Sequence, residues 1–105
     1  MAGRRPRLAD FLLLMHNDYD LGDQIENWQP YLDMLSSAGA LRGGSAIGSG
    51  LCVRRSASAR DISSHLVSYV KIETRDLDHA RQLMVGNPVY EAGGTVEIRE
   101  LPVTG

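Results

Sequence analysis

Residues 9–16 form a nearly uninterrupted apolar run, Ala-Asp-Phe-Leu-Leu-Leu-Met-His. A strand with one face in water alternates apolar and polar side chains, so a run that is apolar on both sides predicts a strand covered on both faces. The chain has 105 residues, the length of one ordinary domain. This strand is therefore expected at the centre of a single domain, and two separate covers have to be found for it.

Two segments show helical periodicity, residues 24–38 and residues 77–85. Pro30 is tolerated only in a first helical turn, so the regular part of the first helix is expected to begin near Asn27 and to stop at Gly39. Asp76 is placed to cap the second helix. The apolar positions are Ile25, Trp28, Leu32 and Leu35 in the first helix, and Leu77, Ala80, Leu83 and Met84 in the second.

Three further segments carry strand signals. Residues 43–54 are glycine-rich and predict a bulged edge strand or a loop that runs into one, followed by a flexible crossing loop over 55–64. Residues 65–73 alternate, with Val70 on one face and Tyr69 on the other, and residues 95–101 alternate as a half-buried strand. The dipeptide Asn87-Pro88 predicts a turn or a short helical stretch before the last strand.

The resulting order is β-α-β-β-α-β. Right-handed crossovers turn this order into a ferredoxin-like α+β fold, a four-stranded antiparallel sheet with both helices on one face. The first strand then has Phe11, Leu13 and Met15 on one face and Leu12 and Leu14 on the other, and the helices cover only one of these faces. A second copy of the sheet is the simplest cover, so we predict a homodimer whose sheets face each other.

Composition excludes several classes of protein. With 43% apolar residues and a net charge of −2, the chain is not expected to be disordered. Three arginines lie in a flexible tail over residues 1–8, and residues 8–105 hold 8 basic and 13 acidic groups, a net of −5 that argues against nucleic-acid binding. The apolar run is too short to cross a membrane. Cys52 has no partner for a disulfide, and a cytoplasmic location is expected.

An ordered set of motifs resembles the YCII-related (DGPF-like) proteins. The resemblance runs over roughly residues 9–102, within a single domain expected over 9–105. It implies a dimeric α+β barrel with a cleft between the first helix and the sheet. The motifs are Trp28-Gln-Pro-Tyr31-Leu32, Gly39-Ala40-Leu41 with Gly43-Gly44, Asp76-Leu-Asp-His-Ala80, Asn87-Pro88, and Gly94-Thr-Val-Glu-Ile-Arg-Glu-Leu-Pro102.

Members of that family thought to be enzymes carry a histidine on the first helix and an aspartate before the proline. Those positions fall on Trp28 and Asn87 here, and neither side chain can exchange a proton near neutral pH, so the dyad is absent. The resemblance favours a small-molecule-binding protein with Trp28, Tyr31, Ser45 and Asn87 around the pocket. Its ligand would be planar or carboxylated. The structural alternative is that Trp28 and Tyr31 are core residues that anchor the helix to the sheet.

Two other functions stay open from the sequence. His16 ends the first strand, and imidazole is the side-chain group best suited to exchange a proton near neutral pH. His16 is therefore a candidate general base of a cofactor-free lyase or isomerase, with Asp18 as its orienting partner. A bonded histidine at a strand end is the structural alternative. The third function is a non-catalytic regulatory dimer. The three histidines are dispersed in the sequence, so we expect no metal site. We also expect no cofactor.

Overall fold

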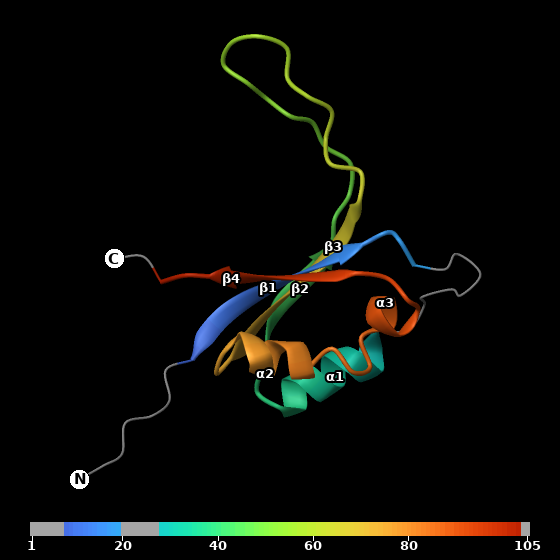
Figure 1. Cartoon of the computed structure of the whole chain (residues 1–105), viewed down its shortest axis with the longest axis vertical. Coiled ribbons are helices and arrows are strands. Elements are labelled where there is room, and N and C mark those ends of the chain that lie inside the picture. The colour runs from blue at the N-terminus through green and yellow to red at the C-terminus, as the bar shows by residue number, and fades with distance from the viewer. Residues whose placement is uncertain (1–7, 20–27, 104–105) are drawn as a thin grey trace.

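The computed structural model describes residues 8–19 and 28–103 and shows a small α+β domain (Figure 1). The elements in chain order are β1 (Ala9–His16), α1 (Gln29–Ser37), β2 (Leu41–Ala46), β3 (Leu66–Thr74), α2 (Leu77–Gln82), α3 (Pro88–Glu91) and β4 (Val96–Leu101). Residues 1–7 of the predicted tail and residues 24–27 of the predicted first helix lie outside the described residues.

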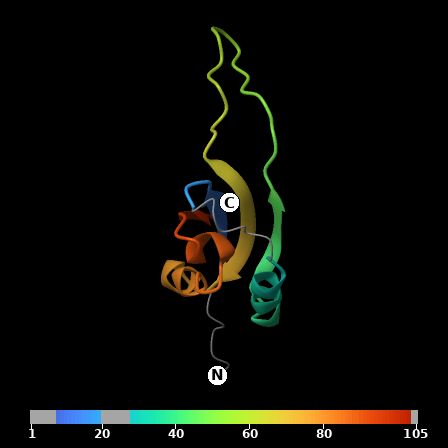
Figure 2. The same cartoon turned by 90° about the vertical axis from the view of Figure 1, so that its right-hand side faces the viewer.

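The four strands form one antiparallel sheet in the order β2-β3-β1-β4, with β1 paired to both β3 and β4. This confirms the predicted four-stranded antiparallel sheet and the bounds of the central strand. The helices all lie on one side of the sheet, with α1 under its β2 edge and α2 and α3 under the other half (Figures 1 and 2). The order is βαββααβ, because the stretch after Asn87 forms a third helix.

The core lies between this sheet and the helices. From β1 it takes Phe11, Leu13 and Met15, which are at most 2% exposed. Their neighbours Leu12 and Leu14 point to the other face and are half-buried. We call this other side the open face; it carries Leu12, Leu14 and His16 from β1, Tyr69 and Lys71 from β3, and Glu97 and Arg99 from β4. In the described part of the chain, no helix covers the open face.

Local signals explain where the helices begin and end. Gly39 follows α1 with φ +72°, a left-handed conformation in which glycine carries no steric cost, and its N–H bonds Ser36. Asp76 accepts a hydrogen bond from the His79 N–H at 2.8 Å and caps α2 as predicted. The helix is shorter than predicted and ends at Gln82. Leu77 was expected to pack, but it is 56% exposed, because the first turn of α2 lies beyond the edge of the core.

The segment between β2 and β3 departs from the prediction. The edge strand is bulged as expected, with a register shift between Leu41 and Gly43, but it covers Leu41–Ala46 instead of 43–54. Residues 47–65, which we call the arm, form an extended excursion without regular secondary structure (Figures 1 and 2). The radius of gyration is 16.3 Å, against about 13 Å for a compact chain of this length.

The predicted alternation along β3 holds only from Ser68 onward. Val70 and Ile72 are buried, whereas Tyr69 and Lys71 are half-buried on the open face. A bulge places Met15 opposite Ser68 but His16 opposite Leu66, which leaves Val67 as an extra residue. Leu66 therefore does not share a face with Val70, contrary to the strict alternation expected from the sequence.

Candidate functional site

A cavity of about 400 Å³ lies between α1 and the β2 edge of the sheet. Its volume is within the range of small-molecule sites in proteins. The lining is mostly apolar, and its side-chain polar groups are hydroxyls and the indole N–H of Trp28. The lining residues are Trp28, Leu32, Leu41, Gly43, Gly44, Ser45, Ala46, Ser68, Tyr69 and Val70.

The glycines of β2 shape this cavity. Gly44 pairs with Val70, and a Cβ atom at Gly44 would lie 2.8 Å from the Tyr69 carbonyl oxygen, closer than real Cβ atoms approach. Gly43 has φ +137°, a conformation that side-chain-bearing residues rarely adopt. The glycines therefore let β2 approach β3 closely, with Gly44 directly against the β3 backbone, and they add no side chain to the wall of the cavity.

Trp28 forms one wall of the cavity, and Tyr31 holds it there. The two rings meet edge to face with centroids 6.0 Å apart. Tyr31 is 3% exposed, its hydroxyl donates to the Leu83 carbonyl oxygen at 2.8 Å, and burial raises its pKa. Tyr31 is thus a neutral anchor behind Trp28, and it does not line the cavity.

The other two residues of the predicted pocket, Ser45 and Asn87, do not lie together. Asn87 is fully buried and caps α3, where its Oδ1 accepts from the N–H groups of Val89 and Tyr90 at 3.0 and 3.1 Å. Ser45 lines the cavity, but it pairs with Tyr69 and its hydroxyl donates to the Ala46 carbonyl oxygen. Trp28 and Ser45 therefore both border the cavity, but the Ser45 side chain shares the open face with Tyr69, on the side of the sheet away from α1, and Asn87 serves the local backbone.

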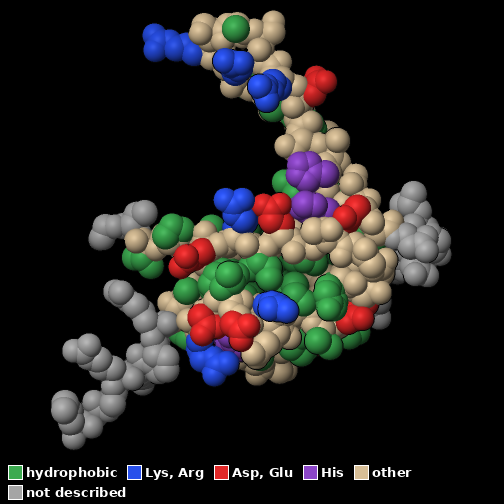
Figure 3. All heavy atoms as spheres, viewed as in Figure 1, with side chains coloured by type: hydrophobic (Ala, Val, Ile, Leu, Met, Phe, Trp, Pro, Cys, Tyr) green, Lys and Arg blue, Asp and Glu red, His purple; other side chains and the backbone are tan. Residues whose placement is uncertain are grey.

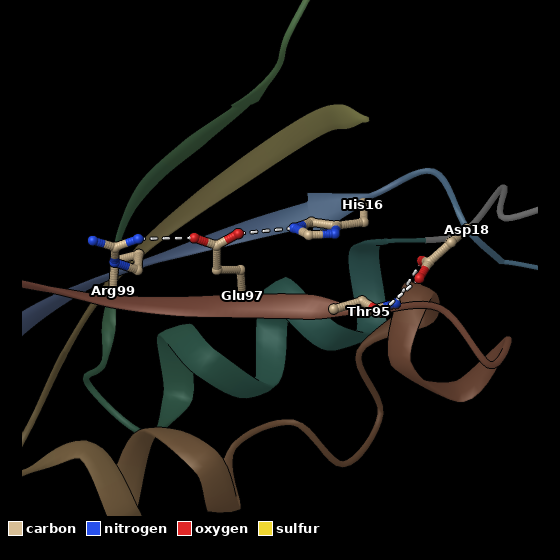
Figure 4. Close-up of polar contacts among 5 residues, drawn as sticks. All are labelled: His16, Asp18, Thr95, Glu97 and Arg99. Atoms are coloured by element: carbon tan, nitrogen blue, oxygen red, sulfur yellow. Dashed lines mark hydrogen bonds and ion pairs between the residues drawn. The ribbon is translucent and has the colours of Figure 1, made fainter. Parts of the chain in front are cut away.

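A second cluster lies on the open face, where His16 is bonded to Glu97 (Figure 4). His16 Nε2 and Glu97 Oε1 are 3.0 Å apart, and Arg99 Nη1 is 3.1 Å from the other oxygen of Glu97. The His16 bond, with that from Arg99, holds the pKa of Glu97 below its ordinary value. The His65 ring meets the His16 ring edge-on at 5.0 Å.

Asp18 was predicted to orient His16, but it is bonded to Thr95 instead (Figure 4). It accepts from the Thr95 N–H at 2.8 Å and from the Thr95 hydroxyl at 2.6 Å. The turn after β1 begins at Asn17, so Asp18 no longer follows the strand direction of His16 and reaches the start of β4. Its role in this geometry is to tie the end of β1 to the beginning of β4.

This contact predicts a specific pH dependence for the Asp18→Asn variant. The Thr95 bonds hold the pKa of Asp18 below its ordinary value of 3.8. A lowered folded-state pKa contributes stability above pH 3.8 that is lost as the pH falls below that value. The variant should therefore melt at a lower temperature at neutral pH, and its melting temperature should fall less on acidification. Thermal melts by circular dichroism at a series of pH values measure both effects.

Glu100→Gln is the matched control, because Glu100 is an exposed carboxylate of β4 that pairs with Phe11, away from the arm and the open face, and its replacement is expected to leave both the melting temperature and its acid slope unchanged. An Asp18→Asn variant with the wild-type acid slope would contradict a stabilising role of the Thr95 bonds.

Two residues that matter most at these sites were not singled out from the sequence, Ser68 in the cavity and Glu97 beside His16. Ser68 pairs with Ala46 and Met15, so it shares their face of the sheet, and Glu97 pairs with Leu14, so it shares the open face. Both placements follow from strand register, which the alternation within each strand signals only in part.

Within residues 8–19 and 28–103, the histidine, cysteine and acidic side chains form no group of three able to hold a metal ion. None of the described helices is both long and apolar enough to span a membrane. A scan against protein-family models and a search of curated proteins found no match to this chain.

Proposed function

We propose that the protein is a dimeric small-molecule-binding protein of the YCII-related type, with its binding site in the cavity between α1 and β2. The observation that carries this proposal is the position of Trp28, which lines a cavity of about 400 Å³ together with Gly43 and Gly44 of β2. A tryptophan that served only as a core residue would be enclosed by side chains, whereas Trp28 packs against Tyr31 and also borders this cavity.

The residues around the cavity distinguish between the two kinds of ligand expected from the sequence, planar molecules and carboxylates. None of the described residues around the cavity is charged. Arg42 lies between the lining residues Leu41 and Gly43 in the sequence and could bind a carboxylate, but its guanidinium group bonds Glu73 at 3.0 Å instead. An uncompensated carboxylate would lose its hydration on entry without gaining a cation. The ligand proposed here is therefore a planar, uncharged molecule that stacks on the indole and bonds hydroxyl groups such as that of Ser68.

The intrinsic fluorescence of Trp28 tests this proposal, because Trp28 is the sole tryptophan. The protein is titrated with matched pairs of aromatic compounds, neutral quinols beside aromatic acids of the same ring size. The expected result is a saturable change with a quinol and a weaker one with the acid. A flat response across the panel would contradict the proposal and leave proton transfer by His16 and the regulatory dimer as the remaining functions.

A pair of variants at Ser68 tests the location of the site. Ser68→Leu fills the cavity and should weaken binding of the responding quinol by about tenfold or more, since pockets discriminate single methylenes by such factors. Ser68→Ala keeps the space and should bind within a few-fold of the wild type. Titration calorimetry measures both affinities. Equal binding by the leucine variant would place the ligand elsewhere.

The dimer in this proposal uses the open face. Leu12 and Leu14 are half-buried there beside Tyr69. A second sheet stacked on this face would remove these side chains from water, a contribution of roughly 25 cal/mol per Å² of apolar area. The molar mass in solution tests this part of the proposal.

A second candidate function is proton transfer by His16, and the bond to Glu97 favours it. An ionised Glu97 accepts only, so a neutral His16 donates from Nε2 and keeps Nδ1 as the proton acceptor. That arrangement is the orienting half of an acid–base pair. Turnover of a compound that binds at the open face should then be lost in His16→Gln and reduced in Glu97→Gln. Full turnover by His16→Gln would exclude this function.

A further inference from the structure

Most of the arm over residues 47–65 is exposed, although it carries large apolar side chains. Leu51 and Val53 are 76% and 81% exposed, and Ile47 and Ile62 are both 39% exposed. Loops of this length without secondary structure are uncommon in compact domains and usually have a function of their own. The base of the arm is fixed, because the Ile47 N–H bonds Val67 and the Asn17 side chain bonds the Ser64 carbonyl oxygen.

The arm rises from the sheet on the side away from the helices and curls over it (Figure 1). In the space-filling view, the arm and the open face border a broad hollow (Figure 3). Histidine side chains gather at its inner corner, where the rings of His16 and His65 lie 5.0 Å apart. Whatever covers the open face therefore also lies within reach of the arm.

We propose that the arm of each protomer clasps the body of a second copy of this chain, which rests on the open face. This inference rests on the dimer of the proposed function and adds to it a second contact surface. The area of the sheet supports it: its four strands of 8, 6, 9 and 6 residues have a footprint of about 460 Å², whereas a stable interface needs about 800 Å² per partner. The open face alone is too small, and the arm supplies the missing surface.

Charge complementarity points to a copy of the same chain as the occupant. The arm carries Arg54, Arg55 and Arg60 against Asp61, a net of +2, which leaves −4 on the rest of a chain whose total is −2. A basic arm is thus attracted to the acidic body of another protomer. In a two-fold dimer both arms make the same contact, so the attraction counts twice.

The test uses the wild-type chain, because Cys52 is its one cysteine and lies exposed on the arm between Leu51 and Val53. A maleimide-benzophenone is attached to Cys52, a labelled and an isotopically heavy preparation are mixed, and the sample is irradiated. The expected result is a covalent dimer on a denaturing gel, with mass-spectrometric links from Cys52 to body peptides of the other isotope. Molar mass by light scattering is measured on the same sample.

The control carries Cys52→Ser with Ser37→Cys, which moves the probe to the exposed end of α1 on the helix side. Its yield of covalent dimer should be several-fold lower. A dimeric mass without links from Cys52 to the body, or with links only between the two arms, overturns the clasp and leaves the dimer standing. A monomeric mass overturns the dimer itself.

Reversing the charge of the arm gives an independent measurement. Replacing Arg54, Arg55 and Arg60 by glutamate should raise the dimer dissociation constant by about tenfold or more at low salt, and added salt should narrow the difference from the wild type. An unchanged dissociation constant at low salt would count against the clasp. The arm is exposed, so these substitutions leave the core of each protomer intact.

Discussion

Replacement of Leu13 by alanine is expected to lower the free energy of unfolding by about 2–5 kcal/mol. Leu13 is fully buried at the centre of β1, where it pairs with Val70 on one side and Ile98 on the other. Its truncation removes transfer free energy and leaves a cavity between two fixed strands that cannot close on it. A domain of this size has a total stability of about 5–15 kcal/mol, so the variant loses a large part of it.

Urea denaturation at a single protein concentration measures this effect, since the stability of a dimer depends on concentration. Val85→Ala is the control: Val85 is 71% exposed in the turn after α2, and its truncation should stay within about 0.5 kcal/mol of the wild type. A Leu13→Ala variant as stable as the control would mean that β1 is not the centre of the core.

The elements with strong local signals could be predicted from the sequence. The apolar run of β1 gave the correct bounds, and Gly39, Asp76 and Asn87 act at the helix ends as their chemistry requires. In each case the signal and the structure lie within a few residues of each other, so no knowledge of the rest of the fold was needed.

The sites were harder, because they depend on strands that are distant in sequence. His16 and Glu97 are 81 residues apart, and only the register of β1 against β4 shows that they meet. Asp18 was predicted as the partner of His16 because it is close in sequence, but the turn after β1 brings its carboxylate to Thr95. The bounds of β2 were predicted wrongly for another reason. Its glycines and serines do not alternate between apolar and polar side chains, so the sequence at the end of the strand resembles the sequence at the start of the arm.

Replacement of Leu14 by lysine should leave the protomer folded but raise the dimer dissociation constant by about two orders of magnitude or more. Leu14 is next to Leu13 in the sequence but lies on the open face, opposite Tyr69 and Glu97. In an isolated protomer the new ammonium group lies beside the Glu97 carboxylate, a favourable cross-strand pair. Between two stacked sheets the ammonium group loses its hydration, and Glu97, which already bonds His16 and Arg99, offsets this cost only in part. An unpaired buried charge costs about 3–5 kcal/mol.

Sedimentation equilibrium gives the dissociation constant, and circular dichroism shows that the protomer is folded. Leu77→Lys is the matched control, since it makes the same chemical change at a 56% exposed position of α2, away from the open face, and should leave the dimer intact. If Leu14→Lys remains a dimer, the two sheets do not stack and the interface lies elsewhere. If it dissociates while Leu13→Ala only loses stability, then neighbouring leucines on one strand have separate tasks, one in the core and one in assembly.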